Sequence, residues 1–103
     1  MILNVVERLV LLSILPKEGN YATLKVLREL RLNIGFTEEE LKLWQIVSDD
    51  ELGAIRWGTN GEAEIPIGEK ATDIIVDALR KLDQMGKLEE HMFDIYERFI
   101  PTT

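Results

Sequence analysis

The sequence predicts a mostly helical α+β fold. Five segments carry apolar residues at helical spacing, and one segment between residues 55 and 65 alternates apolar and polar residues as a β-hairpin does. The content of 46% hydrophobic and 30% charged residues is that of an ordinary globular domain. Because the 103 residues contain no linker and no repeat, we expect a single compact domain over residues 1–103.

The most apolar stretch of the chain, Ile2–Leu15, is expected to form the central helix of the core. Its apolar positions cover almost the whole helix circumference and leave a narrow polar strip around Asn4, Glu7 and Arg8. A helix of this kind has to be buried on several sides. It is too short and too charged to cross a bilayer, which takes about 20 apolar residues, so we expect no membrane segment.

A second helix is predicted over Tyr21–Ile34, with Asn20 as its N-cap. Gly35 is well placed for the left-handed position that ends many helices. The apolar stripe of this helix consists of Leu24, Leu27, Leu30 and Ile34. Its exposed side carries a basic ridge, which we define as Lys25, Arg28 and Arg31.

A third helix is predicted over about Thr37–Val47. Thr37 and Glu40 have the spacing of a capping box, and the acidic residues of the first turn suit the positive end of the helix dipole. The residues expected to be buried are Leu41, Trp44 and Val47. A polar, solvated loop is expected to follow over residues 48–51.

The alternation after this loop predicts a β-hairpin with a definite register. A turn of only two residues would mix apolar and polar side chains on each face. A three-residue loop over residues 59–61, with Gly61 left-handed, separates them and is therefore expected. This register pairs Ile55 with Ile65, Trp57 with Ala63 and Arg56 with Glu64.

Two further helices are predicted at the end of the sequence. The first, from Gly68 to Met85, is strongly amphipathic and is closed by Gly86. The second, about Leu88–Ile100, is expected to turn Leu88, Met92, Ile95, Tyr96 and Phe99 inward. Phe93 and Ile100 widen this stripe beyond one contact face, so we expect them at the surface as partner-binding residues.

The resulting order, α-α-α-β-β-α-α, is that of a winged-helix domain with two added C-terminal helices. The optional first strand would be missing or reduced to residues 17–20. This order leaves open a second hypothesis, a winged-helix DNA-binding transcriptional regulator. The net charge of −7 and the exposed Glu38 and Glu39 of the third helix argue against binding to nucleic acid. Only the basic ridge of Lys25, Arg28 and Arg31 could reach a DNA backbone.

The residue types needed for catalysis or metal binding are scarce. There is no cysteine, and His91 is the only histidine, so the Glu90 and Asp94 beside it do not complete a zinc site. No phosphate-binding glycine loop is present. We therefore expect neither enzyme activity nor a cofactor or metal. With no basic segment before the first apolar run, the expected location is the cytoplasm.

An excess of apolar residues is the strongest functional signal. Leu32 and Val76 fall on the exposed faces of their predicted helices, in addition to Phe93 and Ile100. One interpretation is scattered apolar surface residues, which are normal in globular proteins. The other, which we adopt as the leading hypothesis, is a noncatalytic, acidic domain that binds a protein partner and associates with itself. The specific expectation is a homodimer through Phe93 and Ile100.

Three segments carry a resemblance to a known group of proteins: Leu9–Asn20, Gly35–Leu41 and Gly68–Leu88. Together they resemble small proteins without assigned activity that are encoded in bacteriophage and prophage genomes. The resemblance implies a cytoplasmic accessory protein of phage origin, and it supplies no activity and no site residues. Small acidic phage proteins often act by binding a host or phage protein, and this analogy agrees with the expected function.

Overall fold

The computed structural model describes residues 1–49 and 54–100, which form a mostly helical α+β fold, as predicted. The elements in chain order are β1 (Ile2–Asn4), α1 (Val5–Ile14), α2 (Tyr21–Ile34), α3 (Glu38–Leu43), β2 (Val47–Asp49), β3 (Ala54–Arg56), β4 (Glu62–Glu64), α4 (Glu69–Gln84), the 3₁₀ turn η1 (Glu90–Met92) and α5 (Phe93–Phe99). The helices follow the predicted order. The predicted hairpin has two strands, whereas the described residues form four, β1 to β4.

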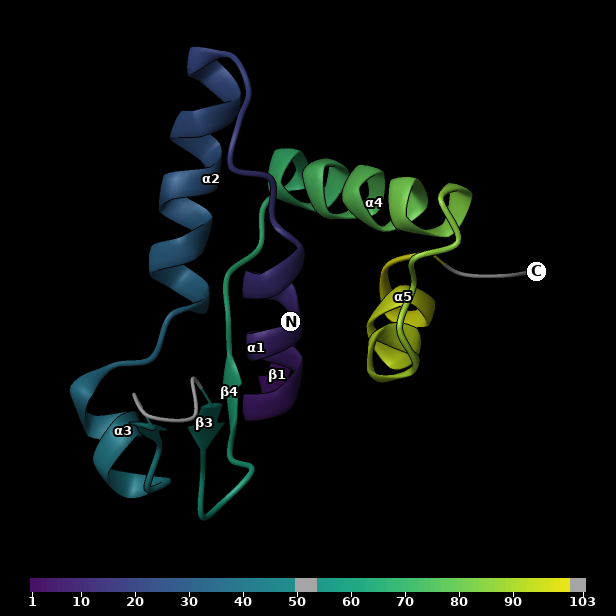
Figure 1. Ribbon diagram of the computed structural model, residues 1–103. Coiled ribbons are helices and arrows are strands. Elements are labelled where there is room, and N and C mark those ends of the chain that lie inside the picture. Colours follow the sequence, from purple (N-terminus) through teal and green to yellow (C-terminus); the bar gives the residue numbers. More distant parts are fainter. Residues whose placement is uncertain (50–53, 101–103) are drawn as a thin grey trace.

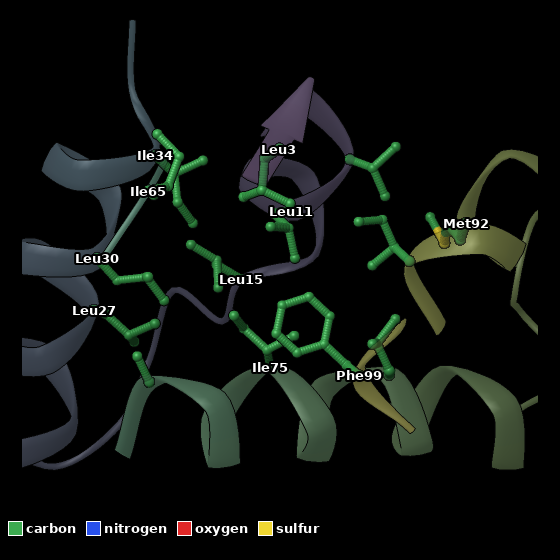
Figure 2. Close-up of a cluster of buried hydrophobic side chains, with 14 residues drawn as sticks. Leu3, Leu11, Leu15, Leu27, Leu30, Ile34, Ile65, Ile75, Met92 and Phe99 are labelled. Atoms are coloured by element: carbon green, nitrogen blue, oxygen red, sulfur yellow. The ribbon is translucent and has the colours of Figure 1, made fainter. Parts of the chain in front are cut away.

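Helix α1 is the centre of the fold, as predicted. It packs against α2, α4 and α5, and Figure 1 shows it standing between α2 and α5 with α4 crossing above. Side chains from all these elements, together with Leu3 of β1 and Ile65, meet in one apolar cluster (Figure 2). The fully buried Leu11 lies within this cluster. No helix in the described part of the chain is both long enough and apolar enough to cross a membrane.

The predicted first helix begins too early, because its first turn is strand β1. Asn4 is extended and accepts a hydrogen bond from the Glu7 amide at 2.8 Å, while the Glu7 carboxylate accepts one from the Asn4 amide at 2.9 Å. This reciprocal capping box fixes the start of α1 at Val5. The freed strand pairs antiparallel with β4, placing Leu3 opposite Ala63.

Helix α2 has the predicted bounds, and Asn20 caps it by accepting a hydrogen bond from the Thr23 amide. The prediction for Gly35 is wrong, because its φ of −61° is not left-handed. The helix ends here in extended backbone, which leaves the Gly35 carbonyl oxygen free to accept a hydrogen bond from Arg8.

Helix α3 begins at the predicted capping box of Thr37 and Glu40 but ends at Leu43, several residues early. Gln45 adopts a left-handed conformation (φ 54°), and the next amide donates back to the Leu41 carbonyl, which closes the helix. The helix buries none of its residues, and Val47 lies in β2, half exposed. The prediction of burial is therefore wrong for Leu41 and Val47, whereas Trp44, at the end of the helix, is half-buried.

The predicted hairpin register is also wrong. Strand β3 pairs with β2, and β4 pairs with β1, so the two halves of the expected hairpin belong to different sheets. Gly61 is not left-handed; a Cβ atom at this position would overlap the Trp44 ring. Of the polar loop expected at residues 48–51, the first two residues lie in β2, and residues 50–51 lie outside the described residues.

The C-terminal part largely follows the sequence. Helix α4 lies within the predicted bounds, and Gly86 ends it with φ of 66°. The last predicted helix begins later than expected, with η1 leading into α5. Its predicted inward residues are buried or half-buried: Leu88, Met92, Ile95, Tyr96 and Phe99.

Candidate interaction surfaces

The two apolar residues predicted to bind a partner differ in their surroundings. Phe93 is 61% exposed on α5, as predicted. Ile100 is half-buried and packs against the core cluster, so the expectation that it has no contact within the chain is wrong, while partner binding by this residue stays a prediction. Ile100 follows directly after the last residue of α5 as its C-cap. A dimer face built on both residues would therefore have less exposed apolar surface than expected.

The predicted basic ridge is only partly exposed. Lys25 and Arg28 are exposed, whereas Arg31 is half-buried and its Nη2 donates to the Pro16 carbonyl oxygen at 2.7 Å. The two apolar residues expected on exposed faces also differ. Leu32 is 76% exposed, but Val76 is half-buried against the core.

His91 lies at the surface, and its ion-pair partner is Glu89 rather than the Glu90 or Asp94 considered from the sequence. Its Nδ1 is 3.2 Å from a carboxylate oxygen of Glu89, and both side chains are more than half exposed. Over residues 1–49 and 54–100, no group of three metal-ligating side chains comes together.

Sequence reasoning missed a buried arginine. Arg8 is 1% exposed, and its guanidinium forms a two-pronged contact with the Glu40 carboxylate, with N–O distances of 2.7 and 3.0 Å. The guanidinium also donates to the carbonyl oxygens of Ile34 (2.8 Å) and Gly35 (2.6 Å). Its central carbon, Cζ, lies 4.2 Å from the centre of the Phe36 ring. Arg8 thus ties α1 to the end of α2 and to the start of α3.

The sequence carries a weak signal for this contact. Arg8 is a cation inside an otherwise apolar run, and such a residue is buried only when its charge is paired. Within the polar strip, Arg8 faces the end of α2 and the start of α3, whereas Glu7 contacts Arg98 of α5. The partner could not be selected from sequence, because many carboxylates are available.

The contact makes Glu40 a stronger acid. Its hydrogen bonds with Arg8 hold the pKa of the Glu40 carboxyl below its ordinary value of 4.5, although burial acts in the opposite direction. A carboxyl whose pKa is lower in the folded protein stabilises the fold above the unfolded-state pKa, and this contribution is lost as the pH falls through the lower, folded-state pKa.

We therefore expect the stability of the wild-type protein to fall as the pH drops below about 4.5. The variant Glu40→Gln should begin at lower stability at pH 7 and lose less on acidification, because it lacks the titrating carboxyl. Urea midpoints at pH 7 and pH 3 measure both effects. Glu39→Gln, one position away and exposed, is the control and should retain the wild-type decrease. An equal decrease in Glu40→Gln and wild type would contradict the assignment.

The end of the molecule beyond the Arg8 contact exposes an unusual number of large apolar side chains. We call α3, β2, β3 and Trp57 the distal lobe; in Figure 1, α3 and β3 lie at the bottom, away from α4 and α5. Its exposed apolar side chains are Leu41 (37%), Leu43 (72%), Val47 (52%), Ile55 (44%) and Trp57 (38%). Several exposed apolar side chains on one lobe are typical of an interaction site.

A second surface feature is a groove beside α4. It has a volume of about 640 Å³ and lies between α4, the turn that joins α1 to α2, and Thr23 in the first turn of α2. Apolar residues from both sides line it: Ile14, Pro16, Ile74, Ala78, Leu82 and Met85. The charged residues on its rim are Glu18, Asp73, Asp77 and Lys81.

Comparisons with known proteins do not select among these surfaces. No protein-family model, no curated protein and no solved structure matches the chain.

Proposed function

We propose that the protein is a noncatalytic binding domain whose partner, another protein, contacts the distal lobe. The observation that carries the proposal is the exposure of five large apolar side chains in the distal lobe. Four of them lie on α3, β2 and β3, and the fifth is Trp57. Full burial of a large apolar side chain is worth about 1.5–3 kcal/mol, and each of these side chains forgoes a share of it that grows with its exposed fraction. A protein partner that covers them recovers part of this energy.

The pairing of β2 with β3 gives this surface two usable sides. Val47 lies opposite Arg56 in the register, and Ser48 lies opposite Ile55, so Val47 and Ile55 point to opposite faces of the sheet. Both side chains are about half exposed. Because an isolated two-stranded sheet is only marginally stable in water, covering either face by a partner would also stabilise the lobe.

The Arg8 contact supports this function by holding the lobe in place. The guanidinium joins α1 of the helical body to Glu40 at the start of α3. An interaction surface fixed to a rigid body loses less conformational entropy on binding than a free segment does. The DNA-binding alternative is disfavoured by the exposed Glu38 and Glu39 on the same helix, which would repel phosphates.

The double variant Leu43→Gln, Val47→Thr tests the proposal. Both substitutions remove exposed apolar surface while suiting a helix and a strand, so the fold should be retained. Wild-type and variant proteins are immobilised and exposed to a lysate of the source organism, and the retained proteins are identified by mass spectrometry. We expect at least one protein to be retained by the wild type and lost, by at least about tenfold, from the variant.

The matched control is Phe93→Gln, which removes an equally exposed apolar side chain from α5. This control should retain the same protein as the wild type. If the distal-lobe variant retains every protein that the wild type does, the proposed surface is wrong. If only Phe93→Gln loses the partner, the interaction lies on α5 instead.

A further inference from the structure

We propose that the chain associates with a second copy of itself by placing the exposed face of α2 in the groove beside α4. This inference goes beyond the proposed function and does not rest on it, because neither surface includes a residue of the distal lobe. It also replaces the predicted dimer through Phe93 and Ile100, of which Ile100 is engaged with the core.

The α2 face is a continuous stripe opposite the buried side of that helix. It consists of Tyr21, Leu24, Lys25, Arg28 and Leu32. The prediction that Leu24 belongs to the inward stripe is wrong, because its side chain is 40% exposed. At 3.6 residues per turn these positions lie on one side, whereas the buried Leu27 and Leu30 lie on the other. Tyr21 is 81% exposed and Leu32 is 76% exposed, so apolar groups mark both ends of the stripe with two cations between them.

The groove has the opposite charge. Its rim carries the carboxylates of Glu18, Asp73 and Asp77 and the ammonium group of Lys81, which leaves the rim two charges negative. Lys81 lies 3.5 Å from Asp77, and both side chains are about 70% exposed, so this surface ion pair is weak. The apolar floor beneath the rim includes Met85, which is 60% exposed.

The two surfaces also match in length. From Tyr21 to Leu32 the helix rises by roughly 16 Å, and from Ile74 to Met85 the rise is the same, because both spans cover eleven residue steps. The cations of the α2 face would then meet the carboxylates of the rim while its apolar ends cover the floor. Complementary charge with apolar cover is the usual arrangement of a specific interface.

The groove is proposed to bind the α2 face of a second copy of the same chain. Helix α2 is held in place by its buried side, so its outward face cannot turn into the groove of the same chain. In another copy this face is free to approach. Because each copy carries both surfaces, a two-fold pair would form two such contacts at once, which is the commonest closed symmetry of small oligomers.

Charge reversal on each surface provides a sharp test. One variant is Lys25→Glu, Arg28→Glu, and the other is Asp73→Lys, Asp77→Lys. All four side chains are exposed, so both variants should fold, as thermal melting followed by circular dichroism will check. Light scattering on a sizing column across the micromolar range measures the mass of each.

We expect the wild type to form a dimer. The dissociation constant of each variant's dimer should be at least about tenfold higher than that of the wild type, because the charge contacts between the two surfaces become repulsive. An equimolar mixture of the two variants should restore a dimer. In the mixture the acidic α2 face of one variant meets the basic groove of the other, and the unaltered surfaces complement each other as well. High salt should weaken the wild-type dimer.

A control variant, Lys42→Glu, reverses a charge on α3, away from both surfaces, and should remain dimeric. The proposal is overturned by a wild-type mass of one chain throughout the range, or by a mixture of variants that stays monomeric. Dimers that persist in both charge-reversal variants also overturn it. The distal-lobe variant Leu43→Gln, Val47→Thr should dimerise normally, so failure here is distinguishable from failure of the proposed function.

Discussion

Replacing Arg8 by methionine is expected to lower the free energy of unfolding by about 3–5 kcal/mol. Methionine fills much of the same space but leaves the Glu40 carboxylate and the carbonyl oxygens of Ile34 and Gly35 without their shared donor. Unpaired polar groups at a buried site carry the full cost of their lost hydration. Urea denaturation at pH 7 measures the loss.

Arg98→Met is the matched control. Arg98 donates to the Glu7 carboxylate and to the Ile2 carbonyl oxygen, but its side chain is 35% exposed, so water can replace these bonds. Its cost should be about 1 kcal/mol or less. The double variant Arg8→Met, Glu40→Met should recover part of the Arg8→Met loss, because no unpaired carboxylate remains. A loss in Arg8→Met no larger than in Arg98→Met would refute the role assigned to Arg8.

Leu11→Asp is expected to unfold the protein at room temperature. Leu11 is fully buried at the centre of the core cluster (Figure 2). Placing a carboxylate there without a partner costs several kcal/mol, and the lost apolar packing adds to it, against a total stability of about 5–15 kcal/mol for a domain. Circular dichroism and the melting temperature report the result.

The neighbouring Leu12 provides a graded comparison. It is half-buried at the margin of the same cluster, so Leu12→Asp can turn its carboxylate toward water and should retain a folded state with a lower melting temperature. Equal melting temperatures for Leu11→Asp and Leu12→Asp would contradict this prediction, because the fully buried position should be the more sensitive of the two. Native melting of Leu11→Asp would contradict the central position of α1.

The helices were predictable because their signals are local. Asn20 caps α2, Thr37 with Glu40 caps α3, and Gly86 ends α4 as predicted, in a left-handed conformation. Each of these signals is read within one turn of the chain. The early start of the first predicted helix is also a local matter, since the Asn4 and Glu7 capping box is present in the sequence and outweighs the apolar run before it.

The strand pairing was not predictable in the same way. The described strands are three residues long, and alternation over so few positions does not choose between neighbours in sequence and distant segments. Strand β4 pairs with β1 because the extended segment before Asn4 offers an edge beside it, and β3 turns back on β2 instead. Gln45 contributes by ending α3 early in a left-handed conformation that residue propensity does not favour.

The candidate surfaces were partly visible in the sequence. The basic residues Lys25 and Arg28 and the exposed Leu32 were identified separately, although their spacing places them on one face of α2. The distal lobe was missed because α3 was expected to bury the side chains that it exposes. The burial of Arg8 depends on three acceptor residues, Ile34, Gly35 and Glu40, that are 26 to 32 positions away in the sequence, so only the assembled fold reveals it.

The pairing of β1 with β4 has a consequence for the order in which the chain folds. Leu3, a fully buried core residue, lies on a strand whose partner follows only after α1, α2 and α3. During synthesis these helices can form as they emerge, but the sheet cannot close until residues 62–64 have left the ribosome. Long-range pairing of this kind slows folding, and until then Leu3 lacks its strand partner. A chain that stalls before β4 would therefore expose its N-terminal strand to chaperones or to other nascent chains.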